Sequence, residues 1–196
     1  MLKGKTVVLG VTGCIAAYKA CEIVSSLKKK GATVIVIMTP HSTEFVQPLS
    51  FETLSGNRVI TDLFDRDFDF EVEHVALAKR ADVFVVAPAT ANTIGKIANG
   101  IADDMLTTTI MACKAPKIIC PAMNTNMYEN ENTTENIARL KKQGYKIIEP
   151  ISGRLACGDV GKGKMAEPET IVKAIEDILT PNQDFEGVRM LITAGS

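Results

Sequence analysis

Three polar residues outside the apolar segments carry side chains suited to catalysis: His74, Asn124 and Cys157. His74 follows an acid-rich segment, and nearby carboxylates favour a protonated imidazole that can exchange a proton near neutral pH. Asn124 follows an apolar segment, and its uncharged amide can hold a carboxylate that is later lost, whereas a cation would stabilise the ground state as well. Cys157 lies among glycines, which favours a chemical role such as proton donation. Ordinary interpretations stay open: a surface histidine, a turn-capping asparagine and an incidental thiol.

Four neutral segments, rich in small, hydroxyl and amide residues, directly follow predicted strands: 10–14, 39–40, 88–93 and 121–128. In an open parallel sheet, ligands bind beyond the carboxyl ends of the strands, so these segments should share one edge. The first of them leads into a helix, whose free N–H groups and dipole favour an anion. We therefore expect an anion site at this edge.

The first segment does not match a dinucleotide-binding fingerprint. That fingerprint has three glycines in G-x-G-x-x-G and, ~20 residues later, an acid that binds a ribose diol. Gly10, Thr12 and Ile15 occupy the three glycine positions, and the second predicted strand ends at Thr39. A hydroxyl at that position can donate to a phosphate, so the sequence favours a mononucleotide phosphate over NAD, although hydroxyls in turns also serve local hydrogen bonds.

Apolar patterns predict the elements that position these residues. Continuous apolar runs and one extended segment predict strands at 5–11, 33–38, 83–87, 117–120 and 146–149. Spacings of three and four, with helix-terminal signals, predict helices at 15–30, 75–80, 93–98, 105–112, 136–143 and 169–179. Apolar strands that alternate with helices indicate the α/β class: a doubly wound, Rossmann-like or flavodoxin-like parallel sheet with helices on both faces.

Composition excludes several classes of protein. The 196 residues suit one main domain, with 46% apolar residues, 23% charged residues and a formal net charge of −1. The lysines at 28–30 end a predicted helix, where cations suit the dipole, so we expect neither nucleic acid nor a membrane as partner. Five cysteines without a C-x-x-C pair, and only two histidines, argue against a disulfide framework and a metal site.

The apolar segments match neither a membrane span nor the core of a secretory signal peptide. No apolar run approaches the ~18 residues needed to span a bilayer. The apolar stretch at 7–11 is shorter than the ~7–15 residues of a signal-peptide core, and it is better interpreted as a strand. Unpaired cysteines fit a reducing compartment. We therefore expect a cytoplasmic protein.

Two segments interrupt the alternation of strands and helices. Residues 62–73 are crowded with acids and aromatics and are typical of an irregular surface loop, while residues 152–164 hold four glycines and are typical of a mobile flap.

The cysteines other than Cys157 lie on or beside apolar elements and are assigned to packing. A helix N-terminus is expected to lower the pKa of Cys14.

The last ten residues, 187–196, start a fresh strand and stop at a glycine turn. We expect residues 1–180 to form one domain, and residues 181–196 to be a linker and the first strand of a second, truncated α/β domain. The alternative is that this strand joins the edge of the first sheet.

Four ordered motifs together resemble the homo-oligomeric flavin-containing cysteine decarboxylases: Gly10-Val-Thr-Gly-Cys-Ile-Ala-Ala-Tyr18, Pro88-Ala-Thr-Ala-Asn-Thr93, Pro121-Ala-Met-Asn-Thr-Asn-Met-Tyr128 and Ala156-Cys-Gly-Asp-Val-Gly161. The resemblance covers residues 5–179 and is greatest for members that act on 4'-phosphopantothenoylcysteine in coenzyme A biosynthesis. Residues 191–195 resemble the opening strand of the phosphopantothenate–cysteine ligase domain that such members carry on the same chain. Cys14 replaces a common glycine or serine, and Tyr128 replaces a common tryptophan.

The resemblance implies an FMN cofactor bound by Gly10, Thr12, Gly13, Cys14, Thr39, Pro88, Ala89, Thr90 and Asn92. It places the substrate against Asn124, Met127, Ala156 and Gly158, and it assigns catalysis to His74, Asn124 and Cys157. It also implies a homo-oligomer built from trimers, with FMN at the contacts between subunits.

The implied reaction follows from the substrate. A cysteine carboxylate has no electron sink, so oxidation of its thiol to a thioaldehyde precedes loss of CO₂, and the resulting enethiol is then reduced to 4'-phosphopantetheine. His74 would assist deprotonation, Asn124 would orient the carboxylate, and Cys157 would supply the returning proton. Three other activities stay open: peptidyl-cysteine decarboxylation in lantibiotic maturation, flavin prenyl transfer, and non-catalytic regulation of a phosphatase.

Overall fold

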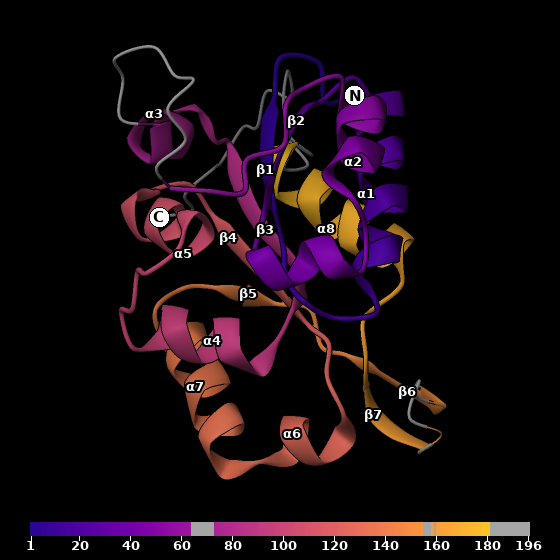
Figure 1. The fold of residues 1–196 in the computed structure, drawn as a ribbon, viewed down its shortest axis with the longest axis vertical. Coiled ribbons are helices and arrows are strands. Elements are labelled where there is room, and N and C mark those ends of the chain that lie inside the picture. Colours follow the sequence, from indigo (N-terminus) through magenta and orange to yellow (C-terminus); the bar gives the residue numbers. More distant parts are fainter. Residues whose placement is uncertain (64–72, 155–157, 159, 181–196) are drawn as a thin grey trace, which may run out of the picture.

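The computed structural model describes residues 1–63, 73–154, 158 and 160–180, and one parallel sheet forms its centre (Figure 1). The strands are β1 (Thr6–Val11), β2 (Thr33–Met38), β3 (Val83–Ala89), β4 (Lys117–Pro121) and β5 (Lys146–Ile147). Their order is β2–β1–β3–β4–β5, and each neighbouring pair is parallel. The chain therefore starts inside the sheet and winds outward in both directions, which places the turns after β1 and β3 side by side.

Helices cover both faces of this sheet (Figure 1). One face carries α1 (Ala17–Lys29), α2 (Pro48–Ser55) and α8 (Pro168–Leu179), and α1 packs against the other two. The other face carries α3 (Glu73–Arg80), α4 (Ala91–Ala98), α5 (Met105–Ala112) and α7 (Glu131–Lys142), with α3 on α5 and α4 on α7. The predicted doubly wound α/β class is confirmed.

The core consists of two apolar layers, one on each side of the sheet. Val7 and Leu9 of β1 belong to the layer under α1 and α8, whereas Val8 belongs to the layer under α4 and α5. All seven residues of β3 are buried. A strand that is covered on both faces must be apolar at every position, so the unbroken apolar run at 83–89 identifies the centre of the sheet.

Shorter elements gather at the carboxyl edge of the sheet. The 3₁₀ helix η1 (Pro40–Glu44) follows β2, and the helix α6 (Thr125–Glu129) follows β4. A separate antiparallel hairpin of β6 (Ile151–Arg154) and β7 (Val160–Lys164) places β7 against α6 (Figure 1). These elements, with the turns after β1 and β3, surround the candidate site.

Most predicted elements are found, some with shifted ends. The strand at 33–38 and the helix at 105–112 are confirmed to the residue. The helix predicted at 136–143 begins at Glu131 instead, because its first turn is largely exposed and lacks apolar spacing. The glycine-rich flap predicted at 152–164 takes the form of the β6–β7 hairpin over its described residues. The helices α2 and α6 were not predicted.

Two expectations fall mainly outside the described residues and stay predictions. They are the acid-rich loop, of which 64–72 are not described, and the linker with its fresh strand at 181–196. Among the helices that are described, none is both long and apolar enough to cross a membrane.

Candidate active site

The turn after β1 is tied to the end of β3 by one side chain, Thr12. Its buried hydroxyl donates to the carbonyl oxygen of Pro88 at 2.8 Å and accepts from the N–H of Thr90 at 3.0 Å. A hydroxyl has a single hydrogen to donate, so this donor is fully used. Thr12 therefore fixes two loops relative to each other, and its hydroxyl has no hydrogen left to donate to a phosphate.

Gly13 allows a close approach between the same turn and η1. A Cβ atom on Gly13 would lie 2.7 Å from the Cβ atom of His41, so any larger residue would force the two segments apart. Thr39 is buried and is the N-cap residue of η1. No described residue accepts a hydrogen bond from the N–H groups of Gly13 or Ile15. The turn therefore presents backbone donors to an anion.

A cavity of about 590 Å³, which we call the α4 cavity, lies between this turn, η1 and α4. Its size is within the range of small-molecule sites. Its walls combine hydroxyl and amide groups with one ionic cluster. It is lined by Gly13, Thr39, Pro40, His41, Thr90, Asn92, Thr93, Lys96, Asp103, Asp104 and Met127.

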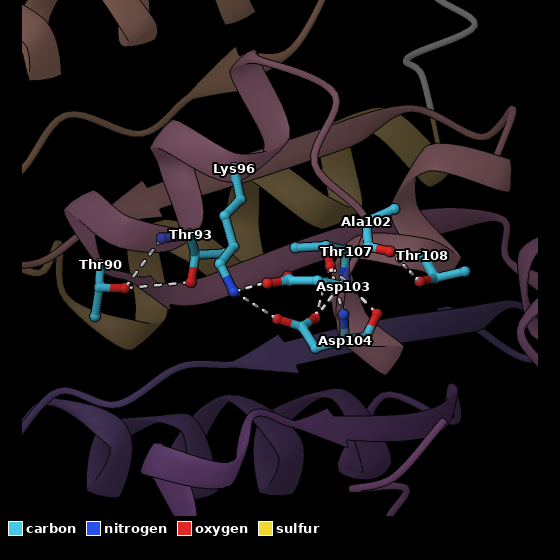
Figure 2. Close-up of polar contacts among 8 residues, drawn as sticks. All are labelled: Thr90, Thr93, Lys96, Ala102, Asp103, Asp104, Thr107 and Thr108. Atoms are coloured by element: carbon cyan, nitrogen blue, oxygen red, sulfur yellow. Dashed lines mark hydrogen bonds and ion pairs between the residues drawn. The ribbon is translucent and has the colours of Figure 1, made fainter. Parts of the chain in front are cut away.

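The ionic cluster of the α4 cavity joins α4 to the start of α5 (Figure 2). The Nζ atom of Lys96 lies 2.7 Å from Asp103 and 3.5 Å from Asp104. Asp104 also caps α5, since its carboxylate accepts from the N–H of Thr107 at 2.8 Å. The hydrogen bond to Asp103 raises the pKa of Lys96, and the same bond lowers the pKa of Asp103. Both shifts favour the charged forms of Lys96 and Asp103, and the cluster contains two acidic residues for one lysine.

A second cavity of about 330 Å³, which we call the hairpin cavity, lies on the other side of the β1–α1 turn. Residues of that turn, of the segment after β4 and of the hairpin line it: Cys14, Ile15, Ala16, Tyr18, Lys19, Ala122, Met123, Asn124, Arg154, Gly163, Lys164 and Met165. Three of these residues are cations. Both lysines pair with Glu167, Lys19 at 2.6 Å and Lys164 at 3.2 Å.

Asn124 and Met127 line different cavities although they are neighbours in the chain. Asn124 lines the hairpin cavity, and Met127 lines the α4 cavity. The Oδ1 atom of Asn124 accepts from the N–H of Asn126 at 2.8 Å, so Asn124 caps α6 as the ordinary interpretation predicted. Capping also fixes the amide at the wall of the cavity, so this local role is compatible with binding a substrate.

Glycines let the hairpin lie directly on the segment after β4. The N–H of Met123 donates to the carbonyl oxygen of Gly163 at 3.0 Å. A Cβ atom on Gly163 would overlap the carbonyl oxygen of Met123, and one on Gly161 would overlap the hydroxyl of Thr125. Both glycines are therefore required by packing rather than by a positive φ angle.

A charged network around Glu149 joins the hairpin to α6 and α7. The carboxylate of Glu149 pairs with Lys141 at 2.8 Å and Lys162 at 3.1 Å, and it accepts from the hydroxyl of Tyr128. The ammonium of Lys162 lies 5.3 Å from the centre of the Tyr128 ring. Partial burial would raise the pKa of Glu149, but the hydrogen bonds from Lys141, Tyr128 and Lys162 outweigh it and lower this pKa to about 2.

The structure divides the residues that were predicted for the site. Gly13, Thr39, Thr90, Asn92 and Met127 meet at the α4 cavity, while Cys14 and Asn124 meet at the hairpin cavity. Four other predicted cofactor residues line neither cavity: Gly10, Pro88 and Ala89 are buried within β1 and β3, and Thr12 is buried directly after β1.

The predicted catalytic residues are not all brought together. His74 lies in the first turn of α3, which packs on α5, and it lines neither cavity. Ala156 and Cys157 lie outside the described residues, and Gly158 is exposed with φ +93°. Their roles stay predictions.

The expectation of an activated Cys14 is wrong. Burial raises the pKa of its thiol, and a hydrogen bond with the backbone of Ala16 offsets this only in part. Burial likewise raises the pKa of Cys21 and Cys120. At Cys14, desolvation of the thiolate therefore outweighs the helix N-terminus, and the raised pKa disfavours the nucleophilic thiolate at all three positions.

Sequence reasoning missed six charged residues that line the two cavities. They are Lys19, Lys96, Asp103, Asp104, Arg154 and Lys164. One local signal was available, because Asp104 directly precedes the apolar helix at 105–112 and is a typical N-cap residue. The cations carried no such signal, since long-range packing alone places them at a cavity.

A doubly wound sheet in the order β2–β1–β3–β4–β5, with cavities at its carboxyl edge, defines a flavodoxin-like class of ligand-binding protein. Within this class the chain belongs to the Flavoprotein family, whose sequence profile matches residues 1–180.

Two relatives show the extent of the similarity. The chain is 50% identical over 197 residues to the coenzyme A biosynthesis bifunctional protein CoaBC of Bacillus subtilis, covering 100% of this chain and 48% of that protein. It is 47% identical over 177 residues to a probable phosphopantothenoylcysteine decarboxylase of Streptococcus mutans, covering 89% of this chain and 99% of that protein. The chain thus spans about half the length of the bifunctional relatives.

Two solved structures share the fold. A PPC decarboxylase, in a cysteine-to-serine mutant complexed with pantothenoylaminoethenethiol, superposes with a TM-score of 0.77 at 35% identity and covers 88% of this chain and 96% of its own. The FMN binding protein AtHal3 superposes with a TM-score of 0.75 at 35% identity and covers 89% of this chain and 96% of its own.

The substitution Gly163→Ala should detach the hairpin from the segment after β4, because the added Cβ atom overlaps backbone that cannot move away cheaply. We expect faster tryptic cleavage at Arg154, Lys162 and Lys164 than in the wild type. Gly153→Ala on β6 is the matched control, since its Cβ atom would lie 3.9 Å from the nearest atom. Equal cleavage rates for the two variants would contradict the packing argument.

The substitution Glu149→Gln should lower stability in a pH-dependent way. The pKa of Glu149 in the folded protein, about 2, lies below its ordinary 4.5, so the stabilisation is full above pH 4.5 and is lost as the pH falls towards 2. Urea unfolding across this range should show the difference from the wild type shrinking with falling pH. Glu135→Gln, at an exposed position of α7, is the control and should show no such trend. A difference that persists at the lowest pH would rule out the ion pairs as its source.

Proposed function

We propose that the chain is an FMN-dependent decarboxylase that converts 4'-phosphopantothenoylcysteine to 4'-phosphopantetheine in coenzyme A biosynthesis. The observation that carries this proposal is the pair of cavities on either side of the β1–α1 turn. The α4 cavity is lined by uncharged groups where it meets the turn, and the hairpin cavity has an amide and three cations on its wall. The names of the relatives support it, because they include both a phosphopantothenoylcysteine decarboxylase and bifunctional coenzyme A biosynthesis proteins.

The residues of the α4 cavity fit FMN. Its volume of about 590 Å³ suits a ligand of that size, and Gly13 leaves the turn free of a side chain that would fill the approach to η1. The N–H of Gly13 and the hydroxyl of Thr39 would hold the phosphate, and Thr90 and Asn92 would hold the remainder. When bound, FMN supplies reversible two-electron oxidation of the substrate thiol.

The residues of the hairpin cavity and of its surroundings would handle the substrate. Asn124 orients the carboxylate without adding a positive charge that would hold it in the ground state. His74 accepts the proton released when the thiol is oxidised to a thioaldehyde. Loss of CO₂ then leaves an enethiol, and Cys157 donates the proton that accompanies its reduction, so the reaction has no net redox change.

We infer two partners from the same reasoning. The bifunctional relatives imply that the natural chain extends into a phosphopantothenate–cysteine ligase domain. The second partner is a copy of the chain itself, in a homo-oligomer built from trimers. His74 supports this, because it lines neither cavity of its own chain and would reach a site from a neighbouring copy.

We also infer a cytoplasmic location. The described cysteines Cys14, Cys21, Cys113 and Cys120 are all free thiols, as a reducing compartment would keep them. A coenzyme A precursor as substrate is consistent with the same compartment.

The proposed function predicts a yellow protein that releases FMN on heating and frees CO₂ from 4'-phosphopantothenoylcysteine. Both are measured on the purified chain, by visible absorption and by mass spectrometry of the product. A nicotinamide in place of FMN, or no CO₂ from the FMN-loaded protein, would refute the proposal. A peptide with a C-terminal cysteine tests the lantibiotic alternative and should remain intact.

The substitution Cys157→Ser should separate the two halves of the reaction. We expect CO₂ release to continue while an enethiol product accumulates, because the proton donor for reduction is lost. The PPC decarboxylase mutant found with pantothenoylaminoethenethiol supports this expectation. Cys21→Ser, at a thiol on α1 outside both cavities, is the matched control. Normal formation of 4'-phosphopantetheine by Cys157→Ser would refute the role.

If neighbouring copies share a site, mixed variants should restore activity that each variant lacks. His74→Asn and Asn124→Ala chains are each expected to be inactive, since each lacks one catalytic group. In doubly tagged trimers about a third of the wild-type rate is expected, because each mixed trimer has one site out of three with an intact residue from both chains. Co-expression with two affinity tags provides the mixed oligomers. No recovery in the doubly tagged fraction would place His74 and Asn124 on the same chain's site.

A further inference from the structure

The hairpin cavity carries a positive charge that its own structure does not neutralise. Lys19, Arg154 and Lys164 line it, and none of its described lining residues is acidic. Glu167 pairs with both lysines. One carboxylate against three cations leaves two positive charges uncompensated. The α4 cavity differs, because two carboxylates there face one lysine.

The three cations come from separate elements, and one carboxylate holds two of them. Lys19, in the first turn of α1, is only 9% exposed and reaches the cavity wall with its ammonium bound to Glu167. Lys164 ends β7 and shares the same carboxylate. Arg154 ends β6, and none of the described residues forms an ion pair or a hydrogen bond with its guanidinium. A guanidinium at a cavity wall that has no partner among the described residues is suited to bidentate binding of a phosphate.

The remaining walls of the cavity suit the body of an elongated molecule with polar ends. Ile15 and Tyr18 are large apolar residues that are 55% and 54% exposed, and Met123 and Met165 complete the apolar lining. Asn124 provides an amide on the same cavity. A ligand with a carboxylate at one end, an apolar middle and a phosphate at the other end would match each part.

We propose that Lys19, Arg154 and Lys164 form a subsite for the phosphate monoester of the substrate. This inference rests on the proposed function, since it places the reacting carboxylate at Asn124 and the phosphate at the cations of the same cavity. The dianion of a phosphate monoester compensates the two remaining positive charges. The subsite therefore makes the enzyme selective for phosphorylated over unphosphorylated pantothenoylcysteine.

The test compares two substrates, 4'-phosphopantothenoylcysteine and pantothenoylcysteine, with the FMN-loaded protein. The wild type should prefer the phosphorylated substrate in kcat/KM. Arg154→Gln and Lys19→Met should each lower kcat/KM for that substrate by about 10-fold to 100-fold, as expected for loss of one hydrogen bond between charged groups. Neither substitution should change kcat/KM for the unphosphorylated substrate. Arg154 is exposed, so its variant keeps the test valid even if Lys19→Met folds poorly.

The matched control is Lys29→Ala, which removes an exposed lysine from the other end of α1 and should leave both values unchanged. Equal losses on the two substrates, or no loss on either, would overturn the subsite. FMN content per chain must also stay constant, because a loss of FMN would assign the cations to the phosphate of the cofactor instead. If the wild type decarboxylates neither substrate, the proposed function itself fails, which is a different result from lost selectivity.

Discussion

One buried hydroxyl fixes the geometry on which both cavities depend. Thr12 bonds to Pro88 and Thr90, 76 and 78 positions along the chain, beyond the point where the ladder between β1 and β3 ends. The strand ladder sets the spacing of the strands, but it leaves the loops after them free to diverge. The hydroxyl removes that freedom, and because Gly13 and Cys14 follow it directly, the same contact positions one wall of each cavity.

The two cavities differ in charge, and this difference sorts the ligands of the proposed reaction. The turns beside the α4 cavity offer neutral donors, which suit an uncharged ring system and a phosphate held by backbone N–H groups. The cluster of Lys96 with Asp103 and Asp104 adds no positive charge there. The hairpin cavity has cations and, among its described lining residues, no carboxylate, so a substrate with two anionic ends would be bound more favourably on that side of the turn.

Local sequence patterns were sufficient to predict the central sheet and several helices. The hairpin, the pKa of Cys14 and the charges at the cavities depend instead on long-range packing. The strand at 33–38 and the helix at 105–112 were predicted to the residue because most of their buried positions hold apolar residues at the spacing of a strand or a helix. The hairpin has no apolar pattern of this kind. Gly161 and Gly163 are required because they lie against the side chain of Thr125 and the backbone of Met123, and these contacts cannot be recognised from the neighbouring sequence. The pKa of Cys14 was predicted in the wrong direction for the same reason: the helix N-terminus is local, but the burial that outweighs it comes from segments far along the chain. The cations of the hairpin cavity were missed because they come from segments far apart in the chain, and no regular spacing in the sequence marks a charged residue that lines a cavity.

In the proposed reaction, the hairpin would connect recognition of one end of the substrate to chemistry at the other. Its two strands provide Arg154 and Lys164 to the cavity wall, and Cys157 lies between them in the chain. The network of Glu149 with Lys162 and Tyr128 holds the same hairpin against α6, whose cap is Asn124. Binding energy from a remote phosphate can therefore be used to position the groups that act on the carboxylate and the thiol. A surface loop with a lone cysteine would not provide this connection, whereas a hairpin attached through β7 to α6 and to the segment after β4 provides it.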